Sequence, residues 1–270
     1  MTKPLEGRVA LITGANQGIG AATATALAAL GADVAVTYLR LIEDRDAGRP
    51  PAYGEHRERD GSAVVAAIEA VGQRGLAIEA DLADPETPLR LFDAVEAELG
   101  AVDVLVNNAS GWRKDTFGYE AADWIGRANS VVTADTVDAQ YLVDARGGAL
   151  MISAYAQRHR AREATWGRII SLTSGGPMGF PGEASYGAAK AALENYTMTA
   201  SIELAARGIT ANVVYPPVTD TGWVTDEVRA FVGASNDHVH VAEPGDVAEV
   251  IAWLCTNAAR MVTGNVIRMR

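Results

Sequence analysis

The sequence predicts an α/β protein: a single doubly wound, Rossmann-type domain with a mainly parallel sheet flanked by helices. Short segments that are apolar throughout alternate with longer helical stretches. Strands that are apolar on both faces are typical of a parallel sheet covered by helices on both sides. Right-handed crossovers between such strands give the doubly wound arrangement. No repeat and no linker divides the chain, so residues 1–270 are expected to form one domain.

The alternation assigns the elements in order. The expected strands lie at residues 8–14, 33–38, 76–82, 102–109, 167–174, 209–216 and 264–269. The expected helices lie at residues 21–31, 62–75, 86–100, 183–196 and 244–256, and several are rich in alanine, which favours a helix.

Two stretches interrupt this rhythm. Residues 41–61 are polar, proline-bearing and highly charged, which indicates an inserted surface loop. Residues 111–138 are long for one connection and carry four aromatic side chains. This second stretch is expected either to cover a cofactor or substrate or to pack over the core of the domain.

Composition excludes several classes of function. A formal net charge of −11 and a pI near 4.8 argue against a nucleic-acid partner. No run of 18 apolar residues and no signal peptide is present, so neither a membrane span nor secretion is expected. The lone cysteine, Cys255, lies in an apolar segment and is expected to be a buried, unpaired thiol, as in a reducing cytoplasm. The four histidines show no metal-ligand pattern, so no metal site is expected.

A glycine-rich turn, TGANQGIG at residues 13–20, lies between the first strand and the first helix. Glycines let the backbone turn tightly and approach a ligand closely. The helix that follows presents unpaired N–H groups and a positive dipole end, which suit a pyrophosphate. An ordinary strand–helix turn is the alternative. The expected contacts of the turn are Gly14, Asn16, Gln17, Gly18, Ile19 and Gly20.

Tyr186 and Lys190 stand four residues apart in an alanine-rich run. On a helix, this spacing places both side chains on one face. The pair alone is also compatible with an ordinary surface helix.

The order of these motifs resembles the short-chain dehydrogenase/reductase family. TGANQGIG, then NNAS at residues 107–110, then Ser174, Tyr186 and Lys190 follow one another over nearly the whole chain. The resemblance, which extends to 3-ketoacyl reductase-like members, implies an NAD(P)(H)-dependent oxidoreductase that interconverts a ketone and a secondary alcohol. Reduction of a 3-ketoacyl thioester is an alternative, and a catalytically weak dinucleotide-binding regulator or structural subunit is another.

The resemblance assigns the chemistry to three side chains. Tyr186 is the expected general acid/base, because a nearby ammonium favours the phenolate and lowers a phenol pKa that is otherwise near 10. Lys190 supplies that ammonium and is expected to hydrogen-bond the nicotinamide ribose. Ser174 is expected to hydrogen-bond the substrate oxygen, because it follows the strand that aligns with the corresponding strand of the family. Counting back from Tyr186 by the loop length usual in the family selects Thr173 instead.

Asp144 stands where the family usually has an asparagine that completes a water relay to the lysine. A carboxylate about 6 Å from Lys190 would oppose the effect of the lysine by roughly 3 kcal/mol at an effective dielectric near 20. The relay is expected to survive with an altered pH profile. The alternative is that Asp144 marks a weakened enzyme.

Cofactor preference depends on the end of the second strand. Tyr38 and Arg40 stand where relatives that prefer NAD carry an acid, which favours NADP(H), with NAD(H) possible. Against this, Asn16 and Gln17 supply no basic residue in the glycine turn.

The resemblance also implies contacts beyond the glycine turn and an assembly. Further cofactor contacts are expected at Asp81, Leu82, Asn107, Ala109, Ser110, Tyr186, Lys190, Pro216, Val218, Thr219 and Thr221. Ser110 and Pro217 replace glycines usual in the family, which gives the weak-regulator alternative some support. A homotetramer or homodimer built on long helices is expected, with a small-molecule carbonyl or alcohol as substrate.

Overall fold

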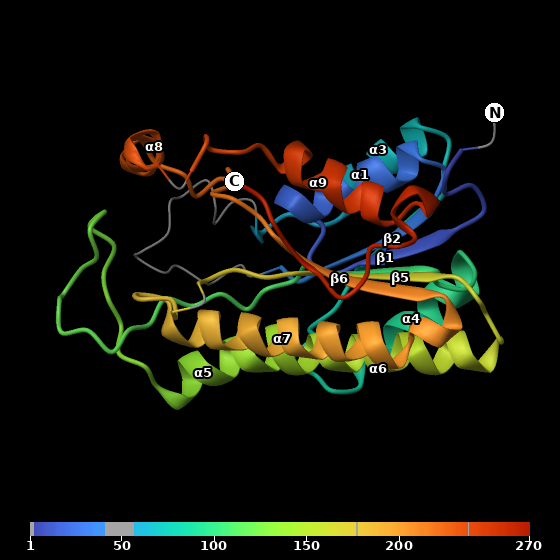
Figure 1. Ribbon diagram of the computed structural model, residues 1–270, viewed down its shortest axis with the longest axis horizontal. Helices are drawn as coiled ribbons and strands as arrows, with labels where there is room; N and C mark the ends of the chain where they lie inside the picture. Colours follow the sequence, from blue (N-terminus) through green and yellow to red (C-terminus); the bar gives the residue numbers. More distant parts are fainter. Residues whose placement is uncertain (1–2, 41–56, 177, 237) are drawn as a thin grey trace.

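The computed structural model describes residues 3–40, 57–176, 178–236 and 238–270, and these form a layered α/β domain (Figure 1). Its sheet has seven strands in the order β3-β2-β1-β4-β5-β6-β7, and every pairing is parallel. The strands are β1 (Val9–Ile12), β2 (Asp33–Tyr38), β3 (Gly75–Glu79), β4 (Val104–Asn107), β5 (Gly167–Leu172), β6 (Ile209–Tyr215) and β7 (Val266–Arg268). The predicted doubly wound fold is confirmed.

The strand order places a switch point beside β1. From β1 the chain first moves outward to β2 and β3, and then returns to β4 on the other side of β1. Leu11 therefore pairs with Ala35 on one side and with Leu105 on the other. Ligands of open α/β sheets bind at the carboxyl ends of the strands where the order reverses. In this chain, that position is occupied by the glycine-rich turn.

Helices cover both faces of the sheet (Figure 1). One face carries α1 (Gly18–Ala29), α3 (Ser62–Ala70) and α9 (Pro244–Leu254), with α1 packed against both of the others. The opposite face carries α4 (Thr87–Glu98), α5 (Ala134–Gln140), the π-helix η1 (Tyr141–Gly147), α6 (Gly148–Ala161) and α7 (Ala184–Glu203). The short helix α8 (Asp226–Ala234) lies beyond the sheet, and 3-10 turns occur at η2 (Ala205–Arg207) and η3 (Asn257–Ala259).

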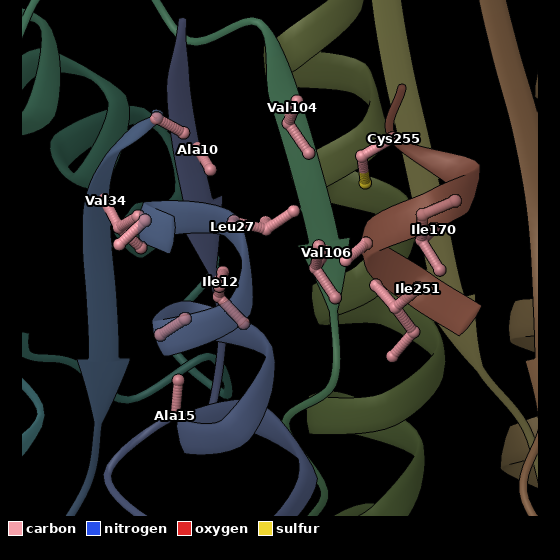
Figure 2. Packing of buried hydrophobic residues seen from close by; sticks show 14 of the residues in the cluster. Ala10, Ile12, Ala15, Leu27, Val34, Val104, Val106, Ile170, Ile251 and Cys255 are labelled. Carbon is pink, nitrogen blue, oxygen red and sulfur yellow. The ribbon is translucent and has the colours of Figure 1, made fainter. Parts of the chain in front are cut away.

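Alternation along the strands divides the core into two clusters. Ile12 and Leu27 belong to the cluster beneath α1 and α9, which Figure 2 shows from close by. Leu11 belongs to the opposite cluster with Phe92 and Met151. Because neighbouring strand residues point to opposite faces, each apolar strand serves both clusters.

Several elements differ from the sequence expectation. The full extent of the helical stretch from α5 through α6 and the helix α8 were not predicted, and α7 extends beyond the predicted residue 196. Because α5 begins at Ala134, the irregular part of the second interruption is shorter than predicted. Most of the first interruption, residues 41–56, lies outside the described residues. Cys255 is buried and unpaired, as expected, and burial raises the pKa of its thiol to about 12. Among the described helices, none has the length and hydrophobicity needed to cross a bilayer.

Candidate active site

A cleft of about 1100 Å³ opens at the carboxyl ends of the strands. The glycine-rich turn lines one part of it, and the first turns of α7 line another. Residues of the segment 111–127, of the loop after β6 and of α8 also line it. The glycine-rich turn and the start of α7 therefore face one shared space.

The glycine turn is built for close approach. Gly14 has φ +63°, and a Cβ there would lie 2.6 Å from the Cα of Ala109. Gly18 has φ +54°, and its Cβ would lie 2.9 Å from Cγ2 of Thr221. A side chain at either position would be strained in the backbone and would collide with a wall of the cleft.

Polar groups at the start of α1 fit a phosphate-bearing ligand. Gln17 precedes the helix without capping it through its side chain, and the first turn carries no acidic residue. Gln17 Oε1 and Ser110 Oγ are buried and have no hydrogen-bond partner among the described residues. Both residues line the cleft. Free helix N–H groups and unsatisfied polar atoms suit a dinucleotide, so the residues present fit this cofactor.

Asn108, which the sequence interpretation missed, holds the glycine turn in place. Its side-chain amide donates to the carbonyl oxygens of Thr13 at 3.0 Å and Gly14 at 2.7 Å. The Thr13 hydroxyl in turn accepts from the backbone N–H groups of Asn108 and Ala109. The predicted neighbour, Asn107, is instead buried and donates to Ser171 Oγ at 3.4 Å.

Helix α7 carries Tyr186 and Lys190 to the same cleft, as their spacing predicts. The Lys190 ammonium lies 5.6 Å from the centre of the Tyr186 ring. Phe180 lies 6.0 Å from the same ring and also lines the cleft. A buried ammonium, an apolar ring and a phenol therefore meet on one wall.

Asp144 makes a direct ion pair with Lys190. Its Oδ1 lies 2.8 Å from the Lys190 Nζ, and the two side chains are 0% and 3% exposed. The second oxygen, Oδ2, accepts from the backbone N–H of Gly111 at 2.8 Å. The predicted separation of about 6 Å is therefore wrong. Asp144 lies within the π-helix η1, and short π-helical turns are frequent at functional sites. The hydrogen bond from the Gly111 N–H helps to orient its carboxylate.

Both candidates for the substrate hydroxyl lie at the cleft. Thr173 and Ser174 follow β5, and each of them lines the cavity. The Thr173 N–H donates to the Val214 carbonyl at 3.0 Å, so the end of β5 remains tied to β6. The structure brings both hydroxyls to the site and leaves the choice between them open.

Most of the predicted contacts line the cleft. These are Gly14, Asn16, Gln17, Gly18, Ile19, Tyr38, Asp81, Leu82, Ala109, Ser110, Ser174, Tyr186, Lys190, Pro216, Val218, Thr219 and Thr221. Gly20, Arg40, Asn107 and Asp144 do not. A Cβ at Gly20 would lie 2.6 Å from the Gly14 carbonyl, so this glycine serves packing of the turn. Arg40 is held by Glu79, with Nη2 2.6 Å from Oε2.

A second carboxylate near Tyr186 was also missed. Glu183 immediately precedes α7, lines the cleft, and accepts from Trp112 Nε1 at 2.8 Å. Arg127 Nη2 lies 3.5 Å from its other oxygen. Burial is the largest influence on this group and raises the pKa of the Glu183 carboxyl, although Trp112 and Arg127 oppose the change.

Comparison with known proteins identifies the family. A family model described as "Enoyl-(Acyl carrier protein) reductase" matches residues 14–269. The chain belongs to the short-chain dehydrogenase/reductase family. It is 34% identical to a 3-oxoacyl-[acyl-carrier-protein] reductase of Synechocystis sp., with 96% of this chain and 94% of that protein covered. It is 33% identical to the cis-4-hydroxycyclohexanecarboxylate dehydrogenase of Sinomonas cyclohexanicum, with the same coverage.

Solved structures agree with this assignment. A short-chain dehydrogenase from Burkholderia cenocepacia in complex with NADP superposes with a TM-score of 0.80 at 33% identity. The comparison covers 98% of this chain and 97% of that one. As a short-chain dehydrogenase/reductase, the chain is an NAD(P)-dependent oxidoreductase that interconverts a ketone and a secondary alcohol. The resemblance inferred from the motifs is confirmed.

Proposed function

We propose that Tyr186 is the general acid/base of an NADP(H)-dependent ketone reductase. The phenol donates its proton to the carbonyl oxygen in reduction and accepts the alcohol proton in oxidation. Lys190 stabilises the phenolate and hydrogen-bonds the nicotinamide ribose. Ser174 holds the substrate oxygen beside the phenol, and Asp144 orients the lysine. A bound nicotinamide supplies or accepts the hydride.

The observation that carries this proposal is the placement of the Tyr186–Lys190 pair. The two side chains share a cleft with the glycine turn, and the ammonium lies 5.6 Å from the phenol ring. With the ring centre taken as the position of the phenolate charge, an effective dielectric near 20 gives an attraction of about 3 kcal/mol between ammonium and phenolate. The phenol can therefore exchange a proton beside a bound dinucleotide.

Two arguments support NADP(H) as the preferred cofactor. The related Burkholderia protein was solved with NADP. In this chain, the residue that ends β2 is Tyr38 rather than an acid, so no carboxylate at that position repels a 2′-phosphate. Arg40 follows it, and we propose that its guanidinium contacts the phosphate while it remains paired with Glu79. Separate titrations with NADPH and NADH test the preference, which comparable affinities would contradict.

The proposed function is tested by NADPH oxidation against a panel of ketones. Replacing Tyr186 with Phe removes only the hydroxyl, and we expect kcat to fall by roughly 10²- to 10⁴-fold, the usual worth of general acid–base catalysis. NADPH should still bind the variant in a fluorescence titration. Binding without turnover by the wild type would favour a regulatory dinucleotide-binding protein.

A matched pair of variants decides between the two hydroxyls. We propose that Ser174→Ala loses most of the activity while Thr173→Val retains it. Both substitutions remove one hydroxyl at the cleft and leave the backbone pairing of β5 possible. The reverse result would transfer the role to Thr173.

Reduction of a 3-ketoacyl thioester is the second candidate, favoured by the similarity to the Synechocystis reductase. Turnover of acetoacetyl-coenzyme A at a rate well above that of simple cyclic ketones would support it. Equal or slower turnover would support a small-molecule ketone.

We further propose a cytoplasmic homo-oligomer. Ile202 on α7 is 79% exposed, and Tyr141 and Tyr196 also expose much of their rings on this helical layer. Their burial between copies would remove apolar surface from water. Light scattering on the purified chain measures the assembly, and a monomer at micromolar concentration would contradict it.

A further inference from the structure

The start of α7 is capped by a residue remote in sequence. The first N–H groups of a helix have no partner within the helix. Glu183, at the position where a side chain usually caps, makes no such bond. Instead, the Ser185 N–H donates to Asp115 Oδ1 at 2.9 Å, and the Ala184 N–H donates to the Asp115 backbone carbonyl at 3.0 Å. Tyr186 is the next residue along the helix.

Asp115 is fully buried and its carboxylate is well supplied with donors. The Ser185 hydroxyl donates to Oδ2, and the Thr136 hydroxyl donates to the same oxygen at 2.7 Å. Thr136 lies in the first turn of α5, where it also completes a reciprocal cap with Thr133. One carboxylate thus joins the starts of two helices, and its negative charge suits the positive end of α7.

The adjacent Lys114 fixes the segment that supplies Asp115. Lys114 is 5% exposed, and its ammonium donates to the carbonyl oxygens of Arg127 at 3.0 Å and Ala128 at 3.1 Å. It also lies 3.1 Å from Asp123 Oδ2. The segment therefore has its own buried anchor, so Asp115 is held from both sides rather than following the motion of α7.

We propose that Asp115 is a positioning residue for Tyr186: it caps α7 from the segment 111–133 and fixes where the phenol enters the cleft. This inference rests on the proposed function, because it assigns Tyr186 the proton transfer. Asp115 acts through the backbone of Ala184 and Ser185. The segment 111–133, part of which lines the cleft, thereby also gains a role in positioning Tyr186.

Asp115→Ala and Asp115→Asn test the proposal at 25 °C. An asparagine Oδ1 can still accept from the Ser185 N–H, and the two hydroxyls can rotate to meet its amide, so Asn should keep kcat within about threefold. Alanine removes the side-chain acceptor, and displacements near 1 Å cost on the order of 10²-fold in rate. We expect kcat to fall by roughly 10- to 100-fold with the affinity for NADPH unchanged.

The matched control is Asp246→Ala. Asp246 Oδ2 accepts from the Glu243 N–H at 2.8 Å at the start of α9, on the opposite face of the sheet. This substitution removes a hydrogen-bond acceptor at the start of a helix on the face of the sheet opposite α7, so kcat should stay unchanged. If Asp115→Ala keeps kcat within twofold of this control, the proposal is wrong. If Asp115→Ala does not fold, Asp115→Ser decides, because its hydroxyl oxygen is one bond closer to the backbone than the carboxylate oxygen that accepts from the Ser185 N–H. A threefold or larger loss of kcat supports the proposal, and unchanged kcat overturns it.

Hydrogen exchange separates this proposal from the proposed function. The amides at the start of α7 should exchange faster in Asp115→Ala than in Asp115→Asn, whether or not a substrate is known. If the wild-type protein turns over no ketone or alcohol but the two variants show this difference in exchange, the proposed function is refuted and the capping by Asp115 is retained. An Asp115→Ala protein with kcat within twofold of the Asp246→Ala control would refute the positioning and retain the function.

Discussion

Replacing Asp144 with asparagine should shift the pH dependence of alcohol oxidation to lower pH. In the proposed mechanism, oxidation requires the phenolate form of Tyr186, so the rate should fall on the acid side as this group is protonated. The Lys190 ammonium favours phenolate, whereas the Asp144 carboxylate disfavours it. Because Asp144 Oδ1 lies 2.8 Å from Nζ and Nζ lies 5.6 Å from the ring centre, the carboxylate lies at most about 8.4 Å from the ring.

That limit sets the size of the effect. At 8.4 Å and an effective dielectric near 20, a carboxylate opposes phenolate formation by about 2 kcal/mol, against about 3 kcal/mol gained from the ammonium. Removing 2 kcal/mol of repulsion corresponds to about 1.5 pH units. Because 8.4 Å is an upper limit, we expect the acid-side midpoint of kcat/KM to fall by at least about 1.5 units in Asp144→Asn.

The assay measures NADP⁺ reduction from pH 5 to pH 10 with one alcohol. Asp246→Asn, which removes an equal charge from the far face, should leave the midpoint in place. A midpoint within 0.3 units of wild type in Asp144→Asn would refute the electrostatic reasoning. A higher plateau rate in the variant would show instead that Asp144 weakens the natural enzyme.

Three other substitutions or treatments give direct tests. Burial raises the pKa of Glu183, so ionisation of this carboxyl destabilises the folded state. Glu183→Gln should therefore raise Tm at pH 7. The gain should vanish as the pH falls toward about 4.3, the pKa of glutamate in the unfolded chain. Thermal denaturation at several pH values checks this, and a constant gain would contradict it. Asn108→Ala loses two bonds to the glycine turn and should weaken NADPH binding about tenfold by fluorescence titration; unchanged affinity would refute the role of this side chain. Cys255, with its pKa near 12, should react with a thiol reagent only after unfolding, and rapid labelling of native protein would show local opening.

The fold could be predicted where burial controls the sequence pattern. The strand Asp33–Tyr38 has the predicted bounds because its four central residues are buried and most of them are apolar. The helical stretch from α5 through α6 was missed for a physical reason. Gly147 and Gly148 lower helix propensity there, and the π-helical turn shifts the 3.6-residue period that reveals an amphipathic helix.

The site could be predicted where spacing alone brings groups together. Tyr186 and Lys190 share a helix, so four residues suffice to place them. Asn107 and Asn108 show where prediction from spacing fails. Neighbouring residues of an extended segment point to opposite sides, and the sequence does not reveal which of the two faces the glycine turn. Asp115 and Ser185 are 70 residues apart in the sequence, so no local sequence pattern predicts their contacts.

The spacing of the tyrosine and lysine therefore explains only part of the site. Each member of the pair is held by a buried carboxylate from another element: Asp144 pairs with Lys190, and Asp115 caps the turn that presents Tyr186. Both carboxylates are held in turn by donors from further segments, including Gly111 and Thr136. A Tyr-x-x-x-Lys pair on an isolated helix would have neither support and would leave both side chains solvated. The reactivity proposed for the pair therefore depends on the segments that converge on α7 as much as on the helix itself.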